Sequence, residues 1–93
     1  MSRDLEKLRA HIDRIDKTIL KALAERKRFE QKIGAHKRSR NIQFLDTKRR
    51  ATMLAARITE GKKMDLPMEF IDKLFRLIHA HSLSVQKGGK AKS

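Results

Sequence analysis

The chain has 93 residues, of which 39% are hydrophobic, a size and composition that suit one small domain with a modest core. Its 24 lysines and arginines against 11 aspartates and glutamates give a formal net charge of +13, which favours anionic partners, either polymers or small molecules. The absence of cysteine excludes a disulfide framework and a thiolate metal site. The first residues lack the apolar core of a secretory signal, and no stretch approaches the roughly 18 apolar residues of a membrane span, so we expect a cytoplasmic protein.

The first predicted element is one long helix over residues 4–38. Its apolar residues recur at intervals of three and four, as one face of a helix requires, at Leu5, Leu8, Ile12, Ile15, Ile19, Ala22, Phe29 and Ile33. Arg26 fills the position that this series leaves open, and Lys37 lies about 20° further round the axis and about 16 Å further along it. Two cations therefore project from a face that should be apolar. Arg26 by itself has an alternative, in which its alkyl stem packs while its head group reaches solvent.

This helix would be about 50 Å long, whereas a compact domain of this size has a radius of gyration of about 12 Å. The rest of the chain is too small to cover it. We therefore predict that the apolar stripe is buried against a second copy, in a homodimer with coiled-coil-like packing. The alternative is a helix that breaks near Gly34 and folds back on its own chain.

Two further helices are predicted after a connecting loop over residues 38–45. Asp46 is placed as the N-cap of a short second helix, and Gly61 as the C′ residue that ends it. Asp65 is placed as the acidic cap of a third helix of medium length, with Pro67 in its first turn. This helix is expected to end near Gln86.

The predicted fold class is therefore all-α, with one helical domain over residues 1–86. Residues 87–93 are rich in lysine and glycine and have nothing to bury, so they are predicted to form a disordered basic tail.

Acid-base or metal chemistry finds little support in the sequence. Six of the acidic residues are scattered among lysines and arginines at the spacings of solvated ion pairs, namely Asp13, Asp16, Glu25, Glu30, Glu69 and Asp72. The four histidines, His11, His36, His79 and His81, do not have the spacing of metal ligands, so no metal is expected. Ser82 and Gln86 share a face of the third helix, although taken alone they favour a C-terminal turn that frays into solvent. Cations remain the abundant functional groups.

Helix geometry restricts which of these cations can share a ligand. Arg9 lies about 25 Å from Arg26 along the same helix, so one small anion cannot touch both in a single chain. In an antiparallel dimer, the partner's Arg9 would instead approach Arg26 and Lys37. The pocket would then be shared between two chains.

Several separate segments, in this order and at these intervals, resemble the all-helical, AroQ-type chorismate mutases. The resemblance extends roughly from residue 5 to residue 86 and is carried by Leu8-Arg9, Ile12-Asp13, Ile15-Asp16, Leu23-Ala24-Glu25-Arg26, Ile33-Gly34 with Lys37, Asp46 with Arg49, and Phe75-Arg76-Leu77-Ile78 with Ser82 and Gln86. It implies an intertwined homodimer with three helices per chain. It also implies a small-molecule substrate, chorismate, that is converted to prephenate without a cofactor.

The resemblance also implies roles for individual residues. Arg26 and the partner's Arg9 would hold the two carboxylates of the substrate, with help from Ser82. Lys37 and Gln86 would meet the ether oxygen of the breaking bond. Asp46 and Arg49 would line the part of the pocket near the ring of chorismate. Such a site fits a unimolecular rearrangement, which needs a correctly held substrate and donors aimed at the oxygen where negative charge grows.

One position departs from the family pattern. The motif after the loop normally ends Arg-Glu, and the glutamate binds the ring hydroxyl of chorismate, but here the pair is Arg49-Arg50. Asp46 or backbone carbonyls would then bind the hydroxyl, or the enzyme is a weak mutase, or its substrate is a relative of chorismate. An isochorismate-pyruvate lyase, which shares the fold and also lacks that glutamate, is the enzymatic alternative.

A nucleic-acid-binding helical dimer is the non-enzymatic alternative, since basic clusters recur along the chain. The lack of Trp and Tyr to stack on bases argues against it, as does a cation set in an apolar stripe.

Overall fold

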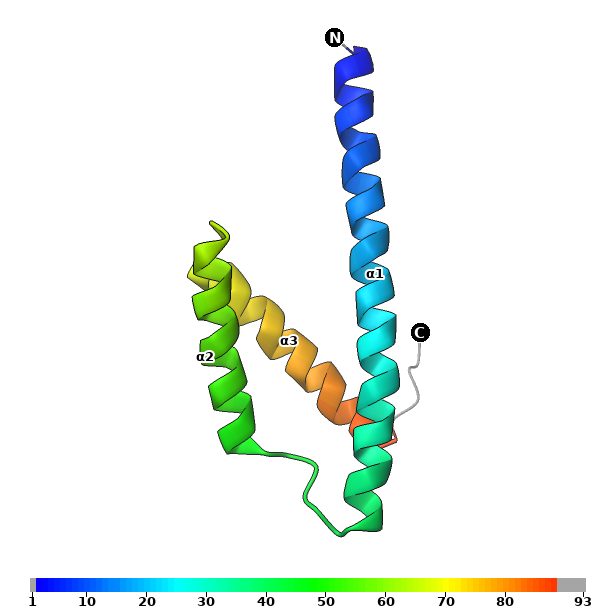
Figure 1. The fold of residues 1–93 in the computed structure, drawn as a ribbon, viewed down its shortest axis with the longest axis vertical. Coiled ribbons are helices and arrows are strands. Elements are labelled where there is room, and N and C mark those ends of the chain that lie inside the picture. Colours follow the sequence, from blue (N-terminus) through cyan, green and yellow to red (C-terminus); the bar gives the residue numbers. More distant parts are fainter. Residues whose placement is uncertain (1, 89–93) are drawn as a thin grey trace.

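The computed structural model describes residues 2–88, which form the three helices α1 (Ser2–Ser39), α2 (Thr47–Lys63) and α3 (Met68–Gln86) (Figure 1). No strand occurs in this range, which confirms the predicted all-α class with three helices. The second and third helices are nearly equal, with 17 and 19 residues, so the expected contrast between a short and a medium helix is wrong. Of the predicted tail, Lys87 and Gly88 form a turn, and residues 89–93 lie outside the described residues.

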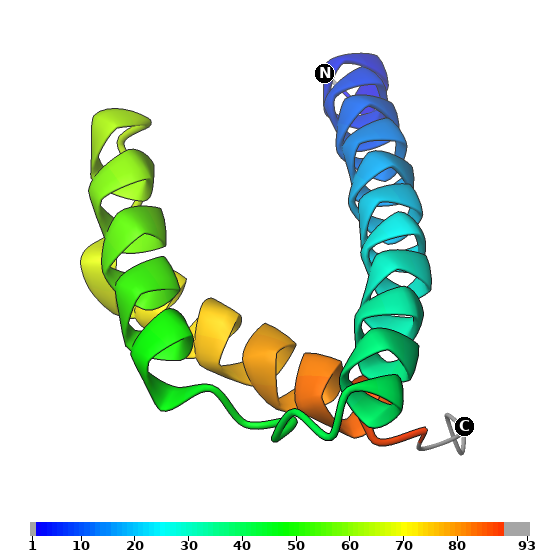
Figure 2. The same cartoon turned by 60° about the horizontal axis from the view of Figure 1, so that its bottom comes forward.

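The N-terminal half of α1 extends away from the rest of the chain. Figures 1 and 2 show that α3 connects α2 to the C-terminal part of α1, whereas α1 and α2 do not pack on each other. The helix runs unbroken through Gly34, so the alternative of a break at this residue is wrong. The radius of gyration is 16.6 Å, well above the roughly 12 Å of a compact domain of this length.

Little apolar surface is buried within one chain. In the described range the buried apolar side chains are Ile71 and Val85, which are 4% and 6% exposed. The apolar stripe of α1 lies open to solvent, with residues between 41% and 62% exposed at Leu5, Leu8, Ile12, Ile15, Ile19, Phe29 and Ile33. A continuous exposed apolar surface of this kind is typical of an interaction site.

The start of α2 was predicted correctly and its end was not. Asp46 is the N-cap, and its side chain accepts a hydrogen bond from the backbone amide of Arg49. Gly61 is not the C′ residue, because it lies buried inside the helix, which continues to Lys63. Close packing explains this glycine, since a Cβ atom there would lie 2.8 Å from Cγ1 of Ile71.

The turn between α2 and α3 also differs from the prediction. Asp65 does not cap α3 but adopts a left-handed conformation, with φ of 61°, a conformation that Asp tolerates better than most residues. The amides of Met64 and Leu66 both donate to the carbonyl of Gly61, which closes the turn. Pro67 is therefore the N-cap rather than a residue of the first turn, and its extended backbone leads into the helix.

At Gly34 the backbone of α1 lies close to the end of α3. A Cβ atom at this position would overlap the backbone oxygen of Gln86. We expect Gly34→Ala to destabilise the protein by about 2 kcal/mol, because the cost of overpacking exceeds the roughly 1 kcal/mol gained when alanine replaces glycine in a helix. Urea unfolding at fixed protein concentration measures this change. Gly61→Ala is the matched control and should cost less, since its nearest neighbour is a side chain; equal stability of Gly34→Ala and the parent would contradict the prediction.

Candidate active site

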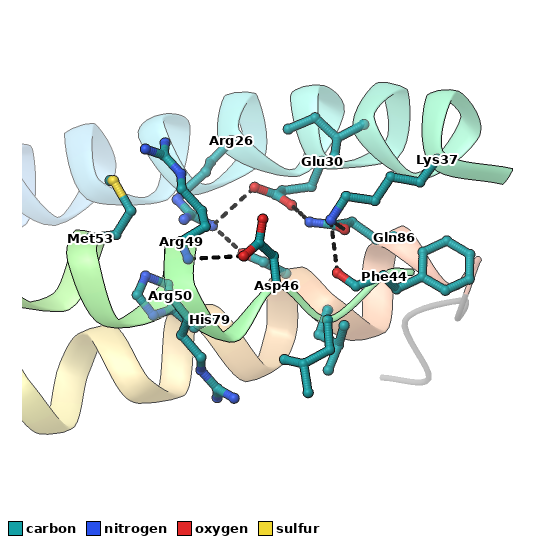
Figure 3. Close-up of a pocket in the computed structure, with 14 residues that line it drawn as sticks. Arg26, Glu30, Lys37, Phe44, Asp46, Arg49, Arg50, Met53, His79 and Gln86 are labelled. Carbon is teal, nitrogen blue, oxygen red and sulfur yellow. Dashed lines mark hydrogen bonds and ion pairs between the residues drawn. The ribbon is translucent and has the colours of Figure 1, made fainter. Parts of the chain in front are cut away.

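A pocket of about 380 Å³ lies between the C-terminal part of α1, the connecting loop, the start of α2 and the second half of α3 (Figure 3). It is lined by Arg26, Glu30, Ile33, Lys37, Phe44, Leu45, Asp46, Arg49, Arg50, Met53, His79, Ser82, Leu83 and Gln86. All the site residues predicted from the sequence are in this set, except Arg9. The three helices thus bring together side chains that are up to 60 positions apart, from Arg26 to Gln86.

Lys37 and Gln86 are joined by a hydrogen bond at one end of the pocket. The Nζ of Lys37 donates to the side-chain oxygen of Gln86 at 2.8 Å and to the backbone oxygen of Phe44 at 2.7 Å. Arg38 donates to the backbone oxygen of Gln86 at 2.7 Å. The end of α3 is therefore tied to α1, and the expectation that its last turn frays is wrong.

Arg26 and Ser82 form a second link between α1 and α3. The Nη1 of Arg26 donates to the hydroxyl of Ser82, which in turn donates to the backbone oxygen of Ile78 at 2.9 Å. Ser82 is only 6% exposed. The alternative of an arginine head group that simply reaches solvent is therefore wrong, because the guanidinium is bonded to a buried hydroxyl in the pocket wall.

Glu30 belongs to the pocket, although the sequence was interpreted as placing it in a solvated ion pair. Its side chain is 13% exposed, with Oε1 at 3.8 Å from Nη1 of Arg26. Its Oε2 accepts a hydrogen bond from Nε2 of Gln86 at 2.5 Å. Helical spacing contained the signal, since Glu30 lies four residues after Arg26 and seven before Lys37 and so shares their face.

The start of α2 adds charge to the opposite wall. Asp46 uses its carboxylate to cap the helix, accepting from the Arg49 amide at 2.9 Å. Between residues 2 and 88, the side chains of Arg49 and Arg50 form no hydrogen bond or ion pair. The pocket contains four lysine or arginine side chains and two carboxylates, a net charge of +2, with two guanidinium groups available to an anion.

His79 is a second pocket residue that the sequence did not single out. Burial lowers its pKa below the ordinary value of 6.5, and the positive charges of Arg26, Arg50 and Arg57 lower it further, while Glu30 opposes them. Its Nδ1 is buried and has no hydrogen-bond partner in the described part of the chain. His79 is therefore neutral at pH 7.

The lowered pKa of His79 predicts how stability depends on pH. Well above pH 6.5 the ring is neutral in both the folded and unfolded chains, so it contributes no pH dependence there. Below that value the unfolded chain takes up the proton first, and stability falls until the pH reaches the lower pKa of the folded state. His79→Leu should make the loss of stability between neutral and mildly acidic pH shallower, as measured by urea unfolding at several pH values. His81→Leu is the control, and an unchanged slope in His79→Leu would contradict the assignment.

Arg9 lies outside the pocket, on the exposed N-terminal half of α1. Along this helix it is about 25 Å from Arg26. A contribution from Arg9 to the same site therefore requires a second chain, and it stays a prediction.

The fold and the pocket define an all-helical protein with a cation-lined site of the size and charge that suit a small anion. Residues 8–87 match the family described as chorismate mutase type II, and the chain belongs to this family.

Two bacterial relatives illustrate the similarity. A bifunctional chorismate mutase/prephenate dehydratase of Buchnera aphidicola subsp. Acyrthosiphon pisum (strain APS) is 43% identical over 79 residues, which is 85% of this chain and 20% of the relative. The T-protein of Enterobacter agglomerans is 30% identical over 82 residues, which is 88% of this chain and 22% of the relative. The chain thus spans about a fifth of the length of the curated relatives it matches. None of the helices in the described range has the apolar length that a membrane crossing requires.

Proposed function

We propose that this chain is a chorismate mutase domain, formed by residues 1–86, that rearranges chorismate to prephenate. The observation that carries the proposal is the convergence of Arg26, Lys37, Arg49 and Gln86 on one pocket in a chain of this family. The pocket has a net positive charge, as a dianionic substrate requires.

The proposed chemistry uses only positioning and electrostatics. Arginines suit the two carboxylates of the substrate because a guanidinium can donate to a carboxylate in a bidentate manner. Lys37 and Gln86 would stabilise the ether oxygen as the bond breaks and negative charge develops there. The rest of the rate enhancement comes from holding the substrate in its compact reactive conformer, since the rearrangement is unimolecular.

The active form is proposed to be an antiparallel homodimer in which each pocket receives Arg9 from the partner. The apolar stripe exposed along the N-terminal half of α1 supports this arrangement. Burial of such a stripe by a second copy is favourable by about 25 cal/mol for each Å² of apolar surface removed from water. The shape also supports it, because the 59 Å long axis of the chain leaves Arg9 far from its own pocket.

Product analysis tests the proposed reaction. The purified protein is incubated with chorismate and, separately, with isochorismate, and the products are identified by chromatography. Prephenate from chorismate is the expected result. Pyruvate released from isochorismate without prephenate from chorismate would instead establish the lyase, which the arginine at position 50 favours as the second candidate.

The substitution Arg50→Glu tests the effect of having arginine where the family motif has glutamate. If chorismate is the substrate, a carboxylate at this position restores the acceptor for the ring hydroxyl, and kcat/KM should rise by about tenfold, the worth of one hydrogen bond to a charged group. Steady-state kinetics on chorismate measure the change. Arg50→Gln supplies an uncharged acceptor as the control, and a decrease in kcat/KM for both variants would show that Arg50 itself binds substrate.

A further inference from the structure

The side-chain amide of Gln86 is held between two groups of opposite charge (Figure 3). On one side its oxygen accepts from the ammonium of Lys37 at 2.8 Å. On the other side its nitrogen donates to the carboxylate of Glu30 at 2.5 Å. The backbone of the same residue is fixed by Arg38, so the amide can change mainly by rotation of its own side chain.

Only one orientation of this amide is compatible with both neighbours. A flip of the amide would place its oxygen against the Glu30 carboxylate, where neither group has a hydrogen to donate. The flip would also place the NH₂ group against the ammonium of Lys37, which has no acceptor. Glu30 is itself held in place, because it is 13% exposed and lies 3.8 Å from Arg26.

This orientation of the amide leaves N–H groups of Lys37 and Gln86 available to a ligand. Lys37 has three N–H groups, of which two are used by Gln86 and the backbone oxygen of Phe44. The NH₂ group of Gln86 has two hydrogens, of which one is used by Glu30. One hydrogen remains on each residue, and the two residues are in direct contact.

We propose that Glu30 is a positioning residue, which fixes the Gln86 amide so that one of its N–H groups and one N–H of Lys37 are presented together to a single acceptor oxygen of the ligand. The identity of that oxygen rests on the proposed function, in which it is the ether oxygen of chorismate. Glu30 itself does not need to touch the substrate.

The negative charge of Glu30 weakens binding of the substrate. A carboxylate beside Arg26 competes with the substrate carboxylate for the same guanidinium and repels a dianion. Removal of the charge should therefore lower KM, while loss of the acceptor should lower kcat. The two effects can be separated, because glutamine retains an acceptor oxygen without the charge and leucine retains neither.

Steady-state kinetics of Glu30→Gln and Glu30→Leu test this separation. We expect KM to fall in both variants. In Glu30→Leu, kcat should fall by about tenfold, because a misdirected donor loses part of the 10²–10³-fold that such a donor contributes to the rate. In Glu30→Gln, kcat should stay within about threefold of the parent, because the acceptor oxygen is retained. In a Gln86→Ala background, Glu30→Leu should cause no further loss of kcat. Equal losses of kcat in the two variants, or an additional loss in the Gln86→Ala background, would overturn the proposal.

A measurement without substrate distinguishes failure of this inference from failure of the proposed function. The ¹H–¹⁵N signals of the Gln86 side-chain amide are assigned by their absence in Gln86→Ala. We expect the hydrogen that bonds to the side chain at position 30 to be protected from exchange in the parent and in Glu30→Gln, and unprotected in Glu30→Leu. This pattern in a protein that leaves chorismate unchanged would reject the proposed function and retain the positioning role. Protection that persists in Glu30→Leu would reject the positioning role even in an active mutase.

Discussion

Replacing Lys37 by alanine is expected to lower kcat for chorismate by about 10²–10³-fold, the loss typical of removing one donor from a developing oxyanion. Lys37 is the cation that donates to the side chain of Gln86, and its third N–H is free for the substrate. Because these donors act mainly in the transition state, KM should change much less than kcat. Steady-state kinetics with purified protein measure both.

The same substitution also removes the hydrogen bond from Lys37 to the backbone oxygen of Phe44, so a control for folding is needed. Circular dichroism and light scattering should show that helix content and assembly of Lys37→Ala are unchanged. Lys48→Ala removes a cation of equal charge from outside the pocket lining and should retain the activity of the parent. If Lys37→Ala turned over chorismate as fast as the parent, the assignment of the site would be wrong.

Mixing two inactive variants is expected to restore activity if the pocket is shared between chains. Arg9→Ala and Lys37→Ala should each be nearly inactive as homodimers. After they are unfolded and refolded together in equal amounts, half of the dimers contain one chain of each kind. In each mixed dimer one pocket carries both defects and the other carries neither, so about a quarter of the parent activity should return.

A matched mixture shows whether the recovery is specific. Arg26 and Lys37 line the pocket of the same chain, so each pocket in a mixed dimer of Arg26→Ala and Lys37→Ala keeps one defect. This mixture should stay inactive. No recovery in the mixture that contains Arg9→Ala, together with light scattering that shows dimers, would place Arg9 outside the partner's pocket.

The helical architecture was largely predictable because it follows from local chemistry. The intervals of three and four along α1 predicted a single long helix, and the N-cap at Asp46 follows from the preference of a carboxylate for the free amides of the first turn. The errors occurred where tertiary contacts override a local preference. Gly61 looks like a helix stop, but it is present because Ile71 packs against it.

The pocket residues that could be predicted are those that interrupt a regular sequence pattern. Residues that fit a common surface pattern were missed. Arg26 was noticed because it interrupts an apolar series. Glu30, by contrast, has the spacing of a common surface ion pair with Arg26, as Glu69 has with Lys73 on the surface. Only its position on the same helix face as Arg26 and Lys37 distinguishes it. His79 was also missed, because its burial and lowered pKa depend on contacts between helices.

The sequence by itself therefore determined the three helices, the excess of positive charge and the cations on the inner face of α1, because helix periodicity and capping act within a few residues. The tertiary structure decided which side chains meet. The crossing of α3 over the C-terminal part of α1 brings Gln86 to Lys37 and Glu30, and the turn into α2 brings Asp46 and Arg49 to the opposite wall. Contacts between residues so far apart depend on how the helices pack, and their spacing along the chain does not encode that packing.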